Sequence, residues 1–232
     1  MIDPVLISIG NIEIRYYGLV FVLGILLVWY FLKKYNVDKR DEVLFYLLIG
    51  MFLGARFFGL LSNGINPISL EFFRVWNGGM AFFGGLLGAL ISGYYVIKKE
   101  GLNLLKIADI VVVPVSFTLI LGRLANYTNG ELLGKLSDVS WCIDLMGCRH
   151  PYTLYAAFLQ LILFVIVLVI FLKVKRKGVT FYSFLIGYGF VRLIGDLFKE
   201  DVRLLGLTYW QYAAILLIIV GIYYLLKRKS VE

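Results

Sequence analysis

At positions 122–134 the chain reads GRLANYTNGELLG, directly after the apolar run Ile107–Leu121. An arginine, two asparagines and a glutamate therefore stand where an apolar segment ends. A guanidinium at the edge of a hydrocarbon layer is costly unless an anion meets it, and its planar fork suits phosphate and carboxylate groups. For Arg123 alone, a polar helix end that reaches into the lipid headgroups explains the pattern equally well, so the rest of the chain has to decide.

Composition indicates a protein with several membrane-spanning segments. The 232 residues are 61% hydrophobic with a mean hydropathy of +0.87, which excludes a soluble single domain. The net charge of +8 comes from short basic clusters between apolar runs. This pattern is typical of membrane orientation rather than of a groove for nucleic acid. We expect no cleavable signal peptide, because the first apolar run is long and no small-residue cleavage site follows it.

Seven segments are long enough to cross a bilayer as helices, which takes about 20 residues each. They lie near residues 16–33, 43–62, 79–97, 106–126, 152–172, 179–199 and 208–226. The sequence thus predicts an all-α polytopic membrane protein, built as a single integral membrane domain over residues 1–232. The longest connection, about 127–151, is predicted to be an extracytoplasmic loop with at most one short element.

The distribution of basic residues predicts the orientation of these spans. Fourteen lie in the connections after spans one, three and five and at the C-terminus: Lys33, Lys34, Lys39, Arg40, Lys98, Lys99, Lys106, Lys173, Lys175, Arg176, Lys177, Lys227, Arg228 and Lys229. Seven lie on the opposite side: Arg15, Arg74, Arg123, Lys135, Arg149, Lys199 and Arg203. The N-terminus is therefore predicted to lie outside and the C-terminus in the cytoplasm.

With this orientation, polar side chains from several spans share one depth near the outer lipid phosphates. They are Tyr17, Arg56, Arg123, Asn126, Tyr188, Arg192 and Asp196. The last three are spaced i, i+4, i+8 and share one helix face. The inner half is nearly free of charge apart from Asp109, which we interpret as a helix-end residue facing the cytoplasm. Scattered structural residues would not gather in this way, so the pattern favours a binding site.

Several features have good structural explanations. Gly50-xxx-Gly54 and Gly84-xxx-Gly88 are typical of close helix packing, and an inert ion pair remains an alternative for Arg192 and Asp196. His150, which precedes a proline, is interpreted as a loop or cap residue rather than a catalytic base. Cys142 and Cys148 are too few for a four-thiolate metal site. We predict that they form a loop disulfide, with spare thiols as the alternative.

Seven blocks of sequence, in order along the chain, carry a resemblance to a known family. They are Asp3-Pro4 with Ile14–Gly18, Gly54-Ala55-Arg56, Trp76–Gly88, Gly122–Gly134, Arg149-His150-Pro151 with Leu154-Tyr155-Ala156, Tyr188–Arg192, and Gly206-Leu207-Thr208 with Gln211. With these blocks the chain resembles the prolipoprotein diacylglyceryl transferase family nearly from end to end. One block alone is a weak signal, but seven in order on seven spans are specific.

The chain also departs from the family pattern. Phe83 stands where the family commonly has histidine, Asp196 where glutamate is common, and Lys199 where arginine is usual. The loop between Glu131 and Arg149 is short. The change at Phe83 leaves the general base of the implied reaction unassigned, whereas it leaves recognition of phosphate by arginine intact.

The resemblance implies transfer of the diacylglyceryl group from phosphatidylglycerol to the lipobox cysteine thiol of a prolipoprotein, with a thioether formed and glycerol phosphate released. It implies a multi-pass protein of the bacterial plasma (inner) membrane, acting in the first step of lipoprotein maturation without a metal or soluble cofactor. The chemistry requires that the thiol become a thiolate and that the charge of the leaving phosphate be met.

We assign the expected roles to residues of this chain. Arg123 and Arg192 are predicted to bracket the phosphate, and Glu131 is predicted to orient the headgroup and is a candidate base. Water or the phosphate itself are alternative proton acceptors. The predicted substrate-binding residues are Tyr17, Arg56, Gly84, Asn126, Asn129, Gly134, Tyr188 and Asp196, with Asp196 aiming Arg192.

Two other classes of function stay open. A lipid or anion transporter would line a path with polar residues, but such a path needs ionisable groups in the inner half of the membrane and a repeated pair of broken spans. A catalytically silent relative that binds lipid or lipoprotein is suggested by Phe83.

Overall fold

The structure is a computed structural model that describes residues 5–9, 12–144 and 146–229. Asp3 and Pro4, which belong to one of the sequence blocks, lie outside these described residues. Contacts divide the chain into two compact units, Met1–Phe31 with Ala108–Glu232 and Leu32–Ile107. Each unit is described by itself, and the prediction of a single integral membrane domain stays a prediction.

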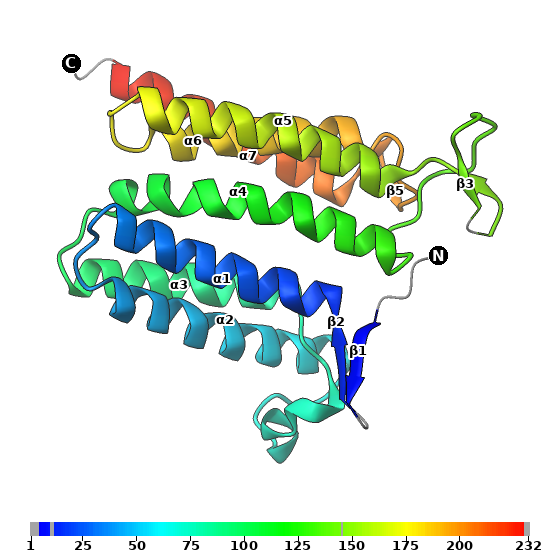
Figure 1. The fold of residues 1–232 in the computed structure, drawn as a ribbon, viewed down its shortest axis with the longest axis horizontal. Helices are drawn as coiled ribbons and strands as arrows, with labels where there is room; N and C mark the ends of the chain where they lie inside the picture. The colour runs from blue at the N-terminus through cyan, green and yellow to red at the C-terminus, as the bar shows by residue number, and fades with distance from the viewer. Residues whose placement is uncertain (1–4, 10–11, 145, 230–232) are drawn as a thin grey trace. The chain divides into compact units, whose positions relative to one another are not determined.

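Helices make up most of the described chain (Figure 1). They are α1 Tyr16–Lys34, α2 Arg40–Ser62, α3 Phe82–Lys99, α4 Leu104–Thr128, α5 Tyr152–Lys173, α6 Val179–Gly195 and α7 Tyr209–Lys229. Five of them, α1, α2, α4, α5 and α7, are long and apolar enough to cross a membrane, whereas α6 is a shorter apolar helix. The helical membrane architecture expected from the sequence is thereby confirmed in its coarse form.

Several helix ends differ by two to four residues from the predicted spans, and two of these differences have a clear cause in the backbone. α3 begins at Phe82 rather than near residue 79, because Gly78 and Gly79 have φ angles of 74° and 76°, which an α-helix excludes. α6 ends at Gly195 rather than near residue 199. The backbone of residues 198–200 pairs instead with the loop after α4: Lys135 N donates to Phe198 O and Glu200 N donates to Leu133 O. Hydropathy alone does not reveal either change of conformation.

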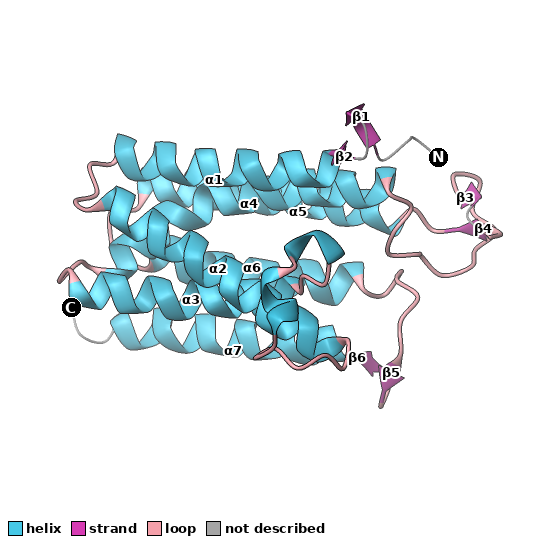
Figure 2. Cartoon of the chain, turned by 90° about the horizontal axis from the view of Figure 1, so that it is seen from below, coloured by secondary structure: helices cyan, strands magenta, loops and turns pink. Residues whose placement is uncertain are grey.

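Among the described residues, one short antiparallel strand pair precedes α1 and two others lie in connections between helices (Figure 2). The pairs are β1 Val5–Ile9 with β2 Ile12–Arg15, β3 Ile143–Asp144 with β4 Cys148–Arg149, and β5 Arg203–Leu204 with β6 Leu207–Thr208. The sequence predicts at most one short element in the loop 127–151 and does not predict the other two pairs. A disulfide joins Cys142 and Cys148 across the β3–β4 turn, which confirms the predicted pairing.

In the first unit, α6 packs against both α5 and α7. A cluster of buried apolar side chains joins α4, α5 and α6: Val112, Val113, Leu163, Val167, Phe184 and Val191. Asp109 of α4 accepts hydrogen bonds from the backbone N–H groups of Gly178 and Phe181 at the start of α6. These groups have no partner within their own helix, so the carboxylate satisfies them and meets the positive end of the helix dipole.

The second unit is built on close packing of α2 against α3. A Cβ atom at Gly54 would collide with the backbone oxygen of Gly84, and one at Gly88 would collide with that of Gly50. The two helices therefore approach through their glycines, as the small-residue pattern predicted. The α2–α3 connection holds two 3₁₀-helices, η1 Leu70–Phe73 and η2 Val75–Asn77.

Candidate active site

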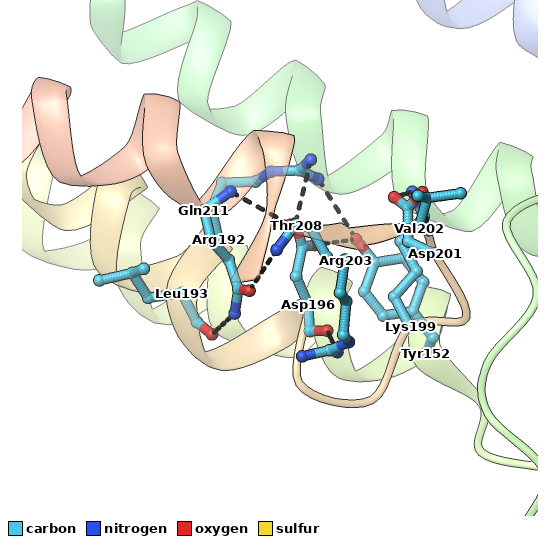
Figure 3. A network of polar contacts seen from close by, with 10 residues as sticks. All are labelled: Tyr152, Arg192, Leu193, Asp196, Lys199, Asp201, Val202, Arg203, Thr208 and Gln211. Atoms are coloured by element: carbon cyan, nitrogen blue, oxygen red, sulfur yellow. Dashed lines mark hydrogen bonds and ion pairs between the residues drawn. The ribbon is translucent and has the colours of Figure 1, made fainter. Parts of the chain in front are cut away.

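Arg192 lies in the last turn of α6, and three side chains hold its guanidinium group. Nη2 is 3.3 Å from Oδ2 of Asp196, and Nη1 donates to the hydroxyl oxygen of Tyr152 over 3.3 Å (Figure 3). The guanidinium carbon lies 5.6 Å from the ring centroid of Trp210 on α7. The i, i+4 spacing of Arg192 and Asp196 therefore does bring them together, while the arginine side chain keeps 12% of its surface exposed.

Asp196 follows the last residue of α6 and is fully buried. Its Oδ1 accepts a hydrogen bond of 2.9 Å from the hydroxyl of Tyr152, and its Oδ2 accepts one of 3.4 Å from Thr208. Its backbone oxygen accepts a 2.9 Å bond from Nη2 of Arg203. A buried carboxylate is tolerated only with such partners, so this network fixes both Asp196 and the direction in which it aims Arg192.

Arg123 of α4 reaches the same tyrosine from another side. Its guanidinium carbon lies 5.8 Å from the ring centroid of Tyr152, within range of a cation–π contact. Over the part of the chain that the structure describes, this guanidinium has no ion-pair or hydrogen-bond partner, so its donors are available to a ligand. Tyr152 on α5 thus contacts both arginines, although they come from helices far apart in the sequence.

The start of α7 shows why Trp210 has a fixed place beside Arg192. Thr208 and Gln211 form a capping box: Gln211 N donates to Thr208 Oγ1 over 3.1 Å, and Thr208 N donates to Gln211 Oε1 over 2.9 Å. The side-chain nitrogen Nε2 of Gln211 also donates to the backbone oxygen of Leu193 on α6 over 3.1 Å. The cap therefore ties the first turn of α7, with its tryptophan, to the last turns of α6.

The loop after α4 gathers the predicted headgroup residues around one carboxylate. Asn126 donates to Oε2 of Glu131 over 2.9 Å, and Asn129 donates to Oε1 over 3.1 Å. Glu131 remains exposed, so its charge is oriented but accessible. Tyr17, in the first turn of α1, lies close enough to Glu131 and Arg123 to interact with both charges.

Backbone contacts fasten this loop to the ends of α5 and α6. Gly134 bridges to Lys199, and its carbonyl accepts a 2.9 Å bond from Nη1 of Arg149. That arginine also pairs with Glu200. A Cβ at Gly134 would collide with the backbone oxygen of His150, so only glycine permits this approach. Gly134 therefore shapes the site through its backbone.

An apolar groove lies beside this polar end of the first unit. It runs between α1 and α4 and is lined almost entirely by apolar atoms, including those of Tyr16, Leu19, Leu23, Leu121 and Leu124. Arg123 precedes one of these lining residues in the sequence. The charged side chain of Arg123 at the end of α4 is therefore adjacent in sequence to a residue that lines the apolar groove.

Three of the predicted substrate-binding residues lie outside the network around Arg123 and Arg192. The ring of Tyr188 stacks on Phe184 at 5.6 Å and packs against the apolar cluster of the first unit. Arg56 and Gly84 belong to the second unit. There Gly84 takes part in helix packing, and every guanidinium nitrogen of Arg56 donates to backbone oxygens: Nε to Phe72, Nη1 to Gly78 and Gly79, and Nη2 to Glu71 and Arg74.

Comparison with known proteins shows the family of this chain. The family model described as prolipoprotein diacylglyceryl transferase matches residues 4–227. The chain belongs to this family. Proteins named phosphatidylglycerol–prolipoprotein diacylglyceryl transferase are 36% identical in Geobacter sulfurreducens (89% of this chain, 85% of that protein) and 33% identical in Ehrlichia ruminantium (99% and 98%). One from Rickettsia bellii is 32% identical over 98% of this chain and 96% of its own length.

For this member of the prolipoprotein diacylglyceryl transferase family, sequence reasoning missed Tyr152, Trp210 and Arg203 as parts of the site. Thr208 and Gln211 appeared only as a family block, although their spacing is that of a capping box and predicts a helix start. Tyr152 gave no comparable signal. A tyrosine at the start of an apolar span is typical of the membrane interface, and only the packing of α4, α5 and α6 reveals its two arginine contacts.

Proposed function

We propose that this chain transfers the diacylglyceryl group of phosphatidylglycerol to the lipobox cysteine of a prolipoprotein. The observation that carries the proposal is the family match over residues 4–227, together with relatives that bear this activity in their names. In the reaction, the cysteine sulfur attacks the glyceryl carbon next to the phosphate. A C–S bond forms, the C–O bond breaks with its electron pair going to the phosphate oxygen, and glycerol phosphate leaves.

Arg123 and Arg192 bracket the phosphate in this proposal. The contact of both guanidinium groups with Tyr152 supports it. Two arginines beside the same residue can each donate charge-assisted hydrogen bonds to one phosphodiester. Preorganised cations stabilise the negative charge that grows on the leaving group and favour the thiolate form of a nearby thiol. Asp196 aims Arg192, and the available donors of Arg123 complete the bracket.

Glu131, Asn126 and Asn129 hold the glycerol headgroup and Tyr17 assists them. Glu131 is also the candidate acceptor of the thiol proton, which supplies the base that Phe83 does not. Phe83 lies in the first turn of α3 with 54% of its surface exposed. The groove between α1 and α4 suits an acyl chain of the bound lipid, because its lining is apolar.

We further propose seven spans in the bacterial plasma membrane, with the N-terminus outside and the site at the outer face. The first unit supports this orientation. Its site residues alternate between the start of α1, the end of α4, the start of α5, the end of α6 and the start of α7. Helices that alternate in direction bring such ends to one side of a bilayer, opposite the basic C-terminus.

The test is a turnover assay on the purified chain with phosphatidylglycerol labelled in its glyceryl group and a lipobox peptide. Wild-type protein is expected to give a thioether-linked lipopeptide, detected by mass spectrometry. Arg123→Ala and Arg192→Ala are each expected to lower kcat by about 10²–10³-fold, as removal of a preorganised charge donor does. Lys135→Ala, which removes an exposed cation from the same loop, is the matched control and should keep near-normal turnover.

Three other results of this assay would contradict parts of the proposal. Wild-type-like turnover in both arginine variants would remove the phosphate bracket while leaving the activity in place. Lipid binding without product, in the assay and in cells depleted of their own transferase, would favour a silent relative. Export of lipid or anion from vesicles without thioether formation would favour a transporter.

A further inference from the structure

We infer that Tyr152 is the positioning residue that holds Arg123 and Arg192 at one site, its ring serving the first and its hydroxyl the second. The inference rests on the proposed function and deepens it. Tyr152 is the first residue of α5 and is only 2% exposed. It lies between α4 and α6 at the end of the first unit where both arginines stand.

The hydroxyl group of Tyr152 is used in both of its capacities. It donates its hydrogen to Oδ1 of Asp196 over 2.9 Å and accepts a bond from Nη1 of Arg192 over 3.3 Å. Asp196 itself contacts Arg192 through its other oxygen at 3.3 Å. The three groups form a closed triangle in which the tyrosine sets the direction of two charged partners at once.

These contacts orient Arg192 and leave some of its N–H donors without a partner in the triangle. A guanidinium has five N–H donors, and the triangle engages Nη1 and Nη2 over distances near the long end of the normal range. Donors therefore remain for a phosphate, which offers shorter, charge-assisted bonds. A fully locked arginine would have to lose bonds before it could bind a ligand.

The ring of Tyr152 addresses a second problem, the repulsion between two cations before the lipid arrives. The guanidinium of Arg123 stands over the ring at 5.8 Å from its centroid, where the negative face of an aromatic ring attracts a cation. A carboxylate in this place would attract both arginines more strongly, but it would compete with the phosphate and repel it. A neutral aromatic side chain holds the two cations and leaves their charge for the substrate.

The two functions of the side chain can be separated by substitution. Tyr152→Phe keeps the ring and removes the hydroxyl, whereas Tyr152→Leu removes both. We expect Tyr152→Phe to lower kcat/KM about tenfold or more and to weaken lipid binding, because the arginine that holds the phosphate loses a hydrogen bond that positions it both before and during the reaction. Tyr152→Leu should lower it by a further factor of about three to thirty, the worth of the cation–π contact.

Double-mutant cycles decide whether the effects run through the arginines. The dissociation constant for short-chain phosphatidylglycerol is measured for each variant in wild-type, Arg123→Ala and Arg192→Ala backgrounds. The effect of Tyr152→Phe should largely vanish in Arg192→Ala and persist in Arg123→Ala. The additional effect of Tyr152→Leu should vanish in Arg123→Ala. Coupled contacts give this non-additivity, whereas a general loss of packing does not.

Tyr182→Phe is the matched control, since Tyr182 is a buried tyrosine at the other end of α6 that stacks on Tyr224 at 5.2 Å. It should change neither turnover nor lipid affinity. Wild-type-like values for both Tyr152 variants, or effects that add in both arginine backgrounds, would overturn the inference. If the wild-type chain binds lipid but makes no thioether product, the proposed function fails. The binding cycles would then still test the role of Tyr152 by themselves.

Discussion

Arg56 and Arg192 are both arginines in apolar helices, yet their surroundings differ in kind. Arg56, in the second unit, is 1% exposed, and each of its guanidinium nitrogens donates to backbone oxygens of residues 71–79. Arg192, in the first unit, is held by three side chains: a carboxylate, a hydroxyl and an aromatic ring. The first arginine organises a loop, whereas the second is oriented and keeps donors for a ligand.

This difference shows that two arginines predicted to lie at a similar membrane depth can have different kinds of hydrogen-bond partners. What matters is whether the donors are already used. Five backbone oxygens around Arg56 would lose their partner if a ligand took it, and unsatisfied buried carbonyl groups are costly. We therefore expect Arg56 to act through stability and Arg192 to act through catalysis.

The largest expected effect is that of Arg56→Ala on the stability of the second unit. Removing the guanidinium leaves the oxygens of the η1–η2 loop without donors, and because each unsatisfied buried group costs about 1–3 kcal/mol, we expect a loss of several kcal/mol. Thermal unfolding in detergent, with limited proteolysis of residues 63–81 as a local probe, measures it. A stable, protease-resistant variant that merely loses lipid affinity would mean that Arg56 binds substrate after all.

Arg74→Ala is the control for this measurement. The Arg74 side chain is about half exposed and pairs with Glu71, so its removal takes away a cation from the same loop. Its backbone oxygen, which accepts from Arg56, is retained. An exposed ion pair contributes at most about 1 kcal/mol, so we expect a small shift in the unfolding temperature.

Asp196→Asn tests the expectation that Arg192, unlike Arg56, acts through catalysis. The substitution keeps the size of the side chain and removes the charge that aims Arg192. Loss of a charge-assisted bond of this kind amounts to about 1.5–3 kcal/mol, or roughly ten- to hundredfold in kcat/KM. Turnover with labelled phosphatidylglycerol measures it, and thermal unfolding serves as the companion readout. A large fall in unfolding temperature with unchanged kcat/KM would show that Asp196 and Arg192 form an inert ion pair.

Sequence predicted much of the fold because hydropathy and glycine spacing act locally. The approximate positions of the α-helices and the close packing at Gly54 and Gly84 follow from such patterns. The late start of α3 did not, because it depends on left-handed backbone at Gly78 and Gly79. The early end of α6 depends on pairing with a loop more than 60 residues away.

The residues of the candidate site also fall into those that sequence patterns predicted and those that only the structure reveals. The i, i+4 rule paired Arg192 with Asp196, and the loop motif gathered Asn126, Asn129 and Glu131. Tyr152 was missed because its role exists only where three helices meet. The substrate-binding role of Arg56 stays a prediction, because its backbone hydrogen bonds are visible in the structure and not in the sequence.

Asp109 extends the comparison to a buried carboxylate whose partners are backbone groups. Like Arg56, it bonds to the backbone, here the N–H groups of Gly178 and Phe181 at the start of α6. Asp109→Ala should therefore cost stability, about 1–2 kcal/mol as for a lost helix cap, with KM and kcat of the folded fraction unchanged. Asp109→Asn, which keeps one acceptor oxygen, should lose less. A selective fall in kcat of the folded protein would mean that Asp109 acts in turnover rather than through stability.

The smallest expected effect concerns Asp201, near the network that orients Arg192. A 2.6 Å hydrogen bond from Lys199 lowers the pKa of the Asp201 carboxyl below its usual range, and burial opposes the shift. Because the pKa is lower in the folded state, the stabilisation is fully present above the ordinary carboxyl pKa, near 4, and is lost as the pH falls through the folded value.

We expect a contribution of at most about 1 kcal/mol from this pair, which is part-exposed. The measurement is the difference in unfolding temperature between wild type and Asp201→Asn at a series of pH values. The difference should be constant from pH 7 to 5 and should shrink below pH 4, whereas other carboxyl groups titrate in both proteins and cancel. A wild type that is less stable than Asp201→Asn at pH 7, with the difference disappearing on acidification, would mean that the charge of Asp201 destabilises the fold.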